Sequence, residues 1–331
     1  MRRNHTLPVT AAFFSILSSG PTYAQAATPA QVVDSLESTF GTHAGQRRNH
    51  TKGTCAAGMF VGAPSAAVYS KSLLFQGSQI PVIARFSVAG GNPSAPDATR
   101  NARGMALEFR LADGGRQHMT MLNTPMFGAA QPETFNALVL AGKPDPTTGK
   151  PDPEAVRAVL AAHPDAKAQW QYLADHNPPP SYANSAFYGI HTFQFVDAGG
   201  ALHPVRWRFV PRDGEKSLSN AELAAAPKDF LERRLLQRVA RGPIQWDMVV
   251  YLGEPGDAIV DPTVTWPEER KHFVAGTLTI KSATVQAGGE CEKINFDPLV
   301  MAAGIAPSAD PILLFRSPAY AVSFGRRLSG K

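Results

Sequence analysis

Arg316-Ser317-Pro318-Ala319-Tyr320, followed by Arg326 and Arg327, is the most informative stretch of this chain. Positions i and i+4 share one face of a helix, so the guanidinium of Arg316 can lie against the phenol oxygen of Tyr320. A free phenol titrates near about pH 10, and a permanent neighbouring cation favours the phenolate, the form in which tyrosine binds ferric iron. The spacing alone also fits a surface tyrosine beside a solvated arginine. With the segments described below, it predicts an iron ligand and its electrostatic partner.

The first 26 residues differ from the rest of the 331-residue chain, which is 44% hydrophobic with a mean hydropathy of −0.16. Arg2 and Arg3 precede an apolar run, and Ala24-Gln25-Ala26 has small residues at both positions that a signal peptidase reads. We therefore expect a cleavable signal peptide over residues 1–26, export to the periplasm, and one domain over residues 27–331. No apolar run in the sequence is long enough to span a bilayer, so we expect no membrane span.

Charge and cysteine content narrow the classes of partner and site. The formal net charge is +5, but no run of lysine or arginine exceeds two residues, which argues against nucleic acid as the main partner. The nine histidines are scattered without the spacing of zinc ligands. Cys55 and Cys291 also lack metal-site spacing. In an oxidising compartment they either form a disulfide or remain two buried thiols, and both readings stay open.

Hydrophobic periodicity predicts two sets of strands with helices between and around them. The expected strands lie at 59–61, 80–87, 105–109, 119–122, 188–195, 205–210, 248–252 and 273–280. The expected helices lie at 31–40, 154–176, 219–241 and 311–328, the last bent by Pro318. A Pro-rich loop is expected over residues 143–153. This pattern predicts an α+β fold, a closed antiparallel barrel with helical insertions.

His50 is the candidate acid/base group. It lies in Arg47-Arg48-Asn49-His50-Thr51-Lys52-Gly53, a loop too polar for a packed core. Cleaving the O–O bond of a peroxide requires a proton to move from one oxygen to the other, and a histidine above an iron can carry it. A lone loop histidine is usually only exposed, so its combination with Tyr320 supports the assignment.

Six segments together cover nearly all of the expected mature chain. They are Arg47-x-x-His50-x-Lys52-Gly53, Arg85-Phe86-Ser87 with 97–104, Asn123-Thr124-Pro125-x-Phe127, Tyr188-Gly189-x-His191-Thr192-Phe193, Gly304-Ile305-x-Pro307-Ser308, and 316–327. They occur in the order found in the haem catalase superfamily, so the chain resembles this superfamily, and most closely its short, exported catalase-related peroxidases. The resemblance implies a catalase barrel core and a C-terminal helix bearing the haem ligand, without the C-terminal helical domain of full-size catalases.

The resemblance also implies roles for individual residues. Haem b with ferric iron and an axial tyrosinate is the implied cofactor, with Tyr320 as proximal ligand and Arg316 as its charge partner. His50 would be the distal acid/base, and Ser87 the hydroxyl that orients it. Buried haem propionates need charge-assisted partners, and the matching positions are Arg47, Arg85 and Arg327. The aromatic positions of the distal pocket are Phe127 and Phe135, for which ordinary core packing is the alternative.

The chain departs from the family at Leu122. Catalases carry Asn-Asn-Thr-Pro, and the first amide orients peroxide, whereas this segment reads Leu122-Asn123-Thr124-Pro125. Leu122 replaces that amide unless Asn123 shifts by one strand position, which would normally turn it to the other face. Losing the hydrogen bond and gaining apolar bulk disfavours hydrogen peroxide and favours organic hydroperoxides.

These observations predict a haem peroxidase that reduces organic hydroperoxides, and hydrogen peroxide weakly, through a ferryl intermediate. Its partners would be the peroxide and an electron donor that the sequence does not identify. A small monofunctional catalase, a fatty-acid hydroperoxide rearrangement and a non-enzymatic haem carrier are the alternatives; Leu122 weighs against the first and His50 against the last. The elements that interlock the family's tetramer and bind its nucleotide are absent, so we expect a smaller oligomer such as a homodimer, without NADPH.

Overall fold

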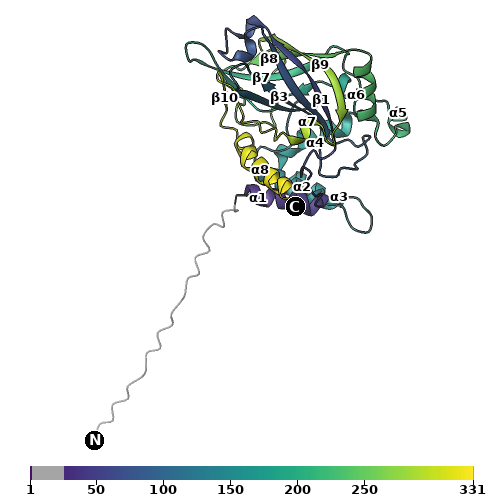
Figure 1. The fold of residues 1–331 in the computed structure, drawn as a ribbon. Coiled ribbons are helices and arrows are strands. Elements are labelled where there is room, and N and C mark those ends of the chain that lie inside the picture. The colour runs from purple at the N-terminus through teal and green to yellow at the C-terminus, as the bar shows by residue number, and fades with distance from the viewer. Residues whose placement is uncertain (2–25, 331) are drawn as a thin grey trace.

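The centre of the protein is a closed antiparallel barrel (Figure 1). The computed structural model describes Met1 and residues 26–330, so nearly all of the predicted signal peptide lies outside the described residues. Within the described part, eight strands close the ring because the last pairs with the first. In ring order they are β7 (Leu202–Pro211), β5 (Phe187–Tyr188), β4 (Arg116–Leu122), β3 (Arg103–Arg110), β2 (Gln79–Val88), β1 (Gly53–Gly62), β9 (His272–Val285) and β8 (Ile244–Leu252). Two further strands, β6 (Phe193–Val196) and β10 (Ile305–Pro307), extend from β7.

The interior of the barrel is a packed core. Along β8, every second side chain is fully buried, namely Ile244, Trp246, Met248 and Val250. The same alternation on β2, β3 and β4 turns residues such as Phe86, Met105 and Met121 inward. Their neighbours in sequence must then point away from the barrel. A site on these strands therefore lies on the outer face of the barrel.

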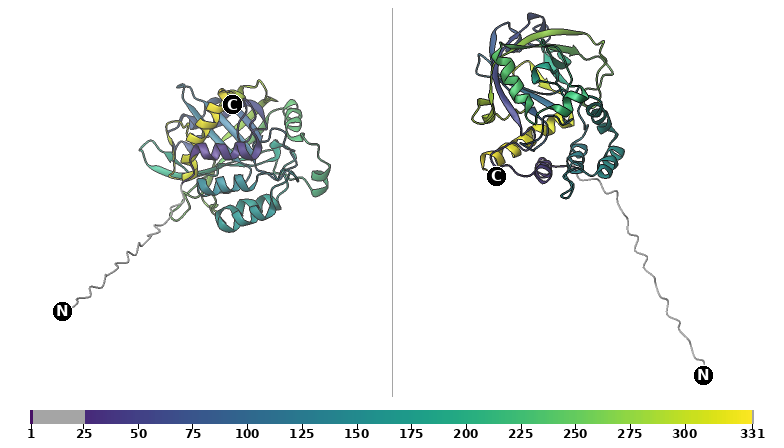
Figure 2. Two further views of the ribbon diagram at one scale, coloured as in Figure 1. Left: turned by 90° about the horizontal axis from the view of Figure 1, so that it is seen from below. Right: turned by 90° about the vertical axis from the view of Figure 1, so that its right-hand side faces the viewer.

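Helices surround the barrel. Figures 1 and 2 show α1 (Pro29–Phe40), α2 (Pro132–Ala141) and α8 (Pro311–Leu328) together at one end of it, with α1 lying against both of the others. The N-terminus of α1 is fixed by a capping box between Thr28 and Gln31. The other helices are α3 (Pro153–Ala162), α4 (Lys167–Asp175), α5 (Asn220–Ala225), α6 (Phe230–Ala240) and α7 (Glu290–Lys293).

Seven of the eight predicted strands are confirmed, but two helix predictions were too long. The helix expected at 154–176 is two helices, α3 and α4, separated at Pro164 by a short 3₁₀ turn. The helix expected at 219–241 is likewise split into α5 and α6, and Pro227 lies in the gap. Proline lacks the N–H that a continuing helix needs and restricts the residue before it, which explains both breaks. The strand expected at 188–195 is also divided, into β5 and β6, and α2 was not predicted.

The two cysteines form a disulfide, which joins β1 at Cys55 to α7 at Cys291. This settles the alternative left open by the sequence, since the described residues contain no free cysteine. Among the same residues, no helix has both the length and the apolar character needed to cross a membrane.

Candidate functional site

One cavity brings together eight of the nine residues predicted from the sequence. It lies between the outer face of the barrel, the loop that carries His50, and helices α1, α2 and α8. The predicted residues that line it are Arg47, His50, Arg85, Ser87, Phe127, Phe135, Arg316 and Tyr320. Arg327, the ninth, is buried close to the cavity but is not among its lining residues; its guanidinium lies 4.6 Å from the centre of the Phe324 ring.

Outward-facing residues of the paired strands β2, β3 and β4 form the floor of this cavity. Ser87 on β2 pairs with Gly104 on β3, and Gly104 pairs with Leu122 on β4. Residues directly opposite each other on neighbouring strands project to the same face, so these three form one row. Two residues further along the strands, Arg85 and Thr120 belong to a second row on the same outer face. The alternation that fills the barrel core therefore also places Ser87, Leu122 and Arg85 in the cavity.

The proximal side of the site is built on α8. Arg316 and Tyr320 are four residues apart on this helix, and the Nη2 of Arg316 donates a 2.7 Å hydrogen bond to the phenol oxygen. The same Nη2 donates to Thr120 on β4, also at 2.7 Å. The predicted contact between the arginine and the tyrosine is therefore present, and the guanidinium is fixed against the barrel.

A buried relay that the sequence did not predict orients Arg316. Its Nη1 donates to Nε2 of His191 at 3.0 Å, and Nδ1 of His191 lies 2.6 Å from a carboxylate oxygen of Asp310. Arginine has only donors, so Nε2 must accept and the ring proton must lie on Nδ1. Asp310 also caps α8 by accepting from the backbone N–H groups of Ile312 and Leu313. Burial lowers the pKa of His191, which favours this neutral tautomer.

The distal side of the site is held by an unusual backbone conformation. His50 has a φ of 53°, the only positive φ at a non-glycine position among the described residues. Such a conformation persists only where the surroundings enforce it. The side-chain oxygen of Asn49 accepts from the N–H groups of His50 and Gly90, and Arg85 donates to the carbonyl of His50 at 2.6 Å. These contacts fix the direction in which the imidazole leaves the backbone.

The His50 ring is held by Ser87 and is uncharged. Its Nδ1 lies 2.9 Å from the Ser87 hydroxyl, as predicted, which leaves the other ring nitrogen for a ligand in the cavity. Burial lowers the pKa of His50 to about 3, with further contributions from the charges of Arg85, Arg316 and Arg47. The imidazole is therefore neutral near pH 7 and can accept a proton.

Gly104 makes room for this pair. A Cβ atom at position 104 would lie 2.8 Å from the Ser87 hydroxyl oxygen and 3.0 Å from Nδ1 of His50. We predict that Gly104→Ala displaces the imidazole and lowers kcat by about 100-fold, the scale of a misplacement of roughly 1 Å. Turnover per bound cofactor measures the effect. Gly325→Ala is the matched control, because a Cβ there meets no atom within 4 Å; equal activity of the two variants would contradict the prediction.

Leu122 points into the cavity, and Asn123 does not. The side-chain oxygen of Asn123 accepts from the backbone N–H of Arg103 at 2.6 Å, and its backbone N–H donates to the Arg103 carbonyl at 2.9 Å. Asn123 lines a separate polar cleft. The alternative register, in which Asn123 takes the place of the missing amide, is thus wrong for this structure. The position next to His50 is apolar.

The remaining walls of the cavity are mostly apolar. Phe127 and Phe135 stack with their ring centres 5.8 Å apart, and both face the cavity. Helix α1 adds Val32, Val33 and Leu36, which sequence reasoning missed because nothing local shows what a helix face packs against.

A cluster of three cations lies at one side of the cavity: Arg85 and Arg327 are buried, and Arg47 is partly buried. Burial, followed by the charges of Arg85 and Arg327, lowers the pKa of Arg47 to about 8. The pKa of Arg85 falls to about 10, mainly through burial. None of the ion pairs among the described residues involves these three arginines. The carboxylate of Glu292 raises the pKa of all three without forming an ion pair with any of them. Three neighbouring cations with no ion-paired carboxylate are the expected property of a site that receives an anionic group.

The donor set therefore fits a haem. A phenol oxygen backed by a guanidinium suits an iron, the apolar walls suit a flat macrocycle, and the cation cluster suits its two carboxylates. Together with the closed barrel, these features define the class of the protein as a catalase-like haem oxidoreductase. The family model "Catalase" matches residues 11–331, and the chain belongs to the catalase family.

Individual relatives support this assignment. The chain is 52% identical to a catalase-related peroxidase of Synechococcus elongatus over 303 residues, which cover 92% of this chain and 89% of the relative. It is 33% identical to a catalase-related peroxidase of Mycolicibacterium paratuberculosis, with 89% and 93% covered. Mouse catalase is 29% identical over 86% of this chain, but only 56% of mouse catalase is covered. Catalase A from Saccharomyces cerevisiae has the same fold, with a TM-score of 0.80 at 24% identity, over 97% of this chain and 69% of that structure.

Proposed function

We propose that the protein is a periplasmic haem b peroxidase that reduces organic hydroperoxides and turns over hydrogen peroxide only weakly. The observation that carries the proposal is the cavity itself. It combines the Tyr320–Arg316 pair, the neutral His50 and the apolar side chain of Leu122. Tyr320, backed by Arg316, can bind an iron. His50 can accept a proton, and Leu122 favours a carbon-bearing substrate.

Haem b would be held from two directions. Tyr320 would bind the ferric iron as a phenolate, with Arg316 stabilising the negative charge on its oxygen. Arg47, Arg85 and Arg327 would bind the propionates, which would in turn relieve the repulsion within the cation cluster. When bound, the haem supplies the redox centre at which the O–O bond is cleaved.

His50 would move the proton during this cleavage. Its neutral imidazole accepts the proton of the hydroperoxide group and returns it to the oxygen that leaves as an alcohol. Ser87 keeps the ring in position, because its hydroxyl lies at hydrogen-bond distance from Nδ1. Overall, a hydroperoxide, two electrons and two protons give an alcohol and water. The two electrons come from a second substrate, the electron donor.

The apolar surroundings of His50 favour organic hydroperoxides. Leu122 offers no hydrogen bond to a second peroxide oxygen, while Phe127, Phe135 and the α1 side chains offer contacts to a carbon tail. The His50–Ser87 pair itself also suits hydrogen peroxide. Dismutation of hydrogen peroxide, the activity of a small catalase, is therefore the second candidate function.

Substitution of Leu122 distinguishes these two functions. We predict that Leu122→Asn increases the ratio of oxygen release from hydrogen peroxide to dye oxidation by an organic hydroperoxide at least tenfold. The introduced amide can contribute about 1–3 kcal/mol to the orientation of a small polar peroxide and removes apolar contact. Leu122→Met is the control, because it preserves both volume and apolar character. A ratio that stays the same in both variants would show that Leu122 does not set the preference.

The periplasmic location is supported by the disulfide and by the N-terminal sequence. Disulfides persist in oxidising compartments, and Cys55 is joined to Cys291. The pattern of residues 1–26 fits export by a cleavable signal peptide. Mass spectrometry of the protein purified from the periplasm would show whether it begins at Ala27.

A further inference from the structure

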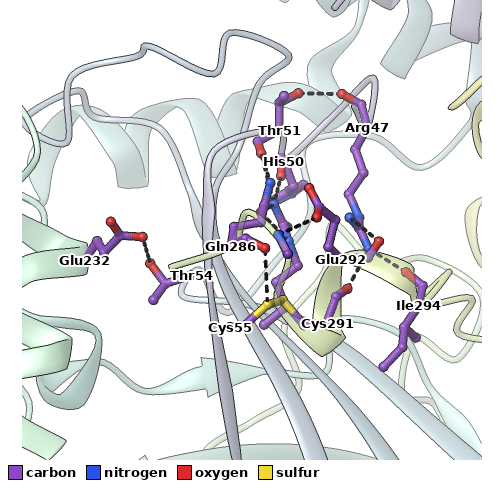
Figure 3. The surroundings of a disulfide bond; sticks show 12 residues. Arg47, His50, Thr51, Thr54, Cys55, Glu232, Gln286, Cys291, Glu292 and Ile294 are labelled. Atoms are coloured by element: carbon purple, nitrogen blue, oxygen red, sulfur yellow. Dashed lines mark hydrogen bonds between the residues drawn. A yellow bond between two sulfur atoms is a disulfide. The ribbon is translucent and has the colours of Figure 1, made fainter. Parts of the chain in front are cut away.

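The disulfide lies directly beside the cation cluster of the proposed haem site. Figure 3 shows Arg47, His50 and Gln286 around the Cys55–Cys291 bond. Residues 286–294, which we call the clamp segment, follow β9 and include α7. This segment supplies most of the acceptors that hold the two arginines of the cavity wall.

Arg47 is held by backbone carbonyls of the clamp segment. Its Nη2 donates to the carbonyl of Cys291 at 3.1 Å and also to that of Ile294, and its Nη1 donates to the carbonyl of Glu292 at 3.4 Å. Carbonyl oxygens accept these donors without neutralising the charge. Arg47 therefore keeps its positive charge for another anion, and its direction depends on where this stretch of backbone lies.

Arg85 is held by a side chain of the same segment. Its Nε donates to the amide oxygen of Gln286 at 2.8 Å, and its Nη2 bonds the same oxygen. The amide nitrogen of Gln286 donates in turn to the carbonyl of Thr51 at 3.2 Å, next to His50. Gln286 thus connects the clamp segment with both Arg85 and the loop that carries the distal histidine.

Among the described residues, the disulfide is the one covalent cross-link of the clamp segment to the barrel; the other contacts are the Arg110–Glu290 ion pair, the packing of α7 against β1 and β2, and the hydrogen bonds given above. The only regular element of the segment, α7, has four residues, far fewer than a helix needs to persist without tertiary contacts. The bond lies in a small apolar cluster of its own, formed by Cys55, Ile83, Cys291 and Phe296, apart from the main barrel core. At Gly289, a Cβ atom would lie only 2.6 Å from the Cys55 sulfur, so the backbone passes directly over the bond.

Arg47 and Arg85 carry like charges, which repel each other when the two side chains are held side by side. Burial lowers the pKa of Arg47, and the like charges of Arg85 and Arg327 lower it further, whereas the charges of Tyr320 and Glu292 act in the opposite direction. Fixed acceptors are therefore needed to hold Arg47 and Arg85 side by side before an anionic ligand arrives. A covalent bond across 236 residues of chain supplies that fixation for the segment that carries the acceptors.

We propose that the Cys55–Cys291 disulfide is a positioning element of the haem site, which holds Arg47 and Arg85 in place for the haem carboxylates through the clamp segment. The proposal rests on the proposed function, because it presumes that haem is the ligand. It follows that the protein retains haem more tightly once the disulfide has formed. Tight haem binding is then coupled to arrival in an oxidising compartment.

The test measures haem release from the loaded protein. Wild type and Cys55→Ala/Cys291→Ala are each loaded with haem and mixed with excess apomyoglobin, and the change in the Soret band gives the rate of transfer. We expect release to be about tenfold faster without the disulfide. Release at the wild-type rate from the folded, haem-loaded double variant would overturn the proposal. Failure of the wild-type protein to bind haem would instead contradict the proposed function.

Two further variants separate positioning from general destabilisation. Leu235→Ala removes a fully buried side chain of α6 in the main core, away from the clamp segment, and should release haem at the wild-type rate. Equal acceleration by Leu235→Ala would show that global stability governs release, against the proposal. Gln286→Ala keeps the disulfide but removes the acceptor that the clamp segment offers to Arg85, and should accelerate release without adding to the effect of the cysteine changes. If the double cysteine variant does not fold, wild-type release from Gln286→Ala overturns the proposal.

Discussion

Tyr320→Phe is expected to abolish tight haem binding. The substitution removes the oxygen that would bind the iron and leaves the partly buried guanidinium of Arg316 facing an apolar ring. Loss of groups that only support a metal ligand costs about 10- to 100-fold in affinity, so loss of the ligand itself should cost at least about 100-fold. Haem titration followed by absorption spectroscopy measures both the affinity and the tyrosinate-type spectrum.

The control for this prediction is Tyr251→Phe. Tyr251 lies on β8, where its ring contacts Arg208, and it does not line the cavity. This variant should bind haem as wild type does. An unchanged spectrum and affinity in Tyr320→Phe would show that another residue binds the iron. It would also remove the reason for placing Arg316, His191 and Asp310 in one functional chain.

His50→Ala is expected to leave haem bound and to reduce peroxide turnover by about 10²- to 10⁴-fold, the usual contribution of a positioned acid/base group. The imidazole is neutral because its pKa falls to about 3, and Ser87 orients it. The other histidine that lines the cavity, His191, is hydrogen-bonded at both ring nitrogens, by Arg316 and Asp310. Stopped-flow measurement of the reaction between the loaded variant and an organic hydroperoxide reports the rate.

His203→Ala is the matched control for the distal assignment. His203 pairs with Asp197 at 3.0 Å and does not line the cavity, so its removal should leave turnover unchanged. Full turnover by the haem-loaded His50→Ala protein would overturn the assignment and favour a haem carrier or a different proton acceptor. The two substitutions thus separate cofactor binding, which depends on Tyr320, from proton transfer, which depends on His50.

Local sequence signals predicted the parts of the site that lie close together in the chain. Arg316 and Tyr320 are one helical turn apart, so a helix was sufficient to bring them into contact. The match to the catalase motifs supplied His50 and Ser87, which are 37 residues apart. The helix breaks at Pro164 and Pro227 were also predictable, because the effect of proline on a helix is local. The helical periodicity on both sides of each proline nevertheless led to the prediction of one continuous helix.

Other parts of the site depend on tertiary contacts that no local pattern reveals. His191 contacts Arg316 across 125 residues of chain, and Asp310 across 119. Each lies in or near a recognised segment, but neither residue type by itself indicates a relay behind an iron ligand. The position of α1 over the cavity and the carbonyl acceptors of Arg47 likewise follow from packing and not from periodicity.

The most direct test of the peroxidase proposal compares two reactions of the purified, haem-loaded wild-type protein. One is oxygen release from hydrogen peroxide, followed with an oxygen electrode. The other is oxidation of a reporter dye by an organic hydroperoxide, followed by absorbance. We predict rapid dye oxidation with little oxygen release. Fast oxygen release with slow dye oxidation would contradict the account and identify a small catalase, while inactivity in both reactions would leave a haem carrier.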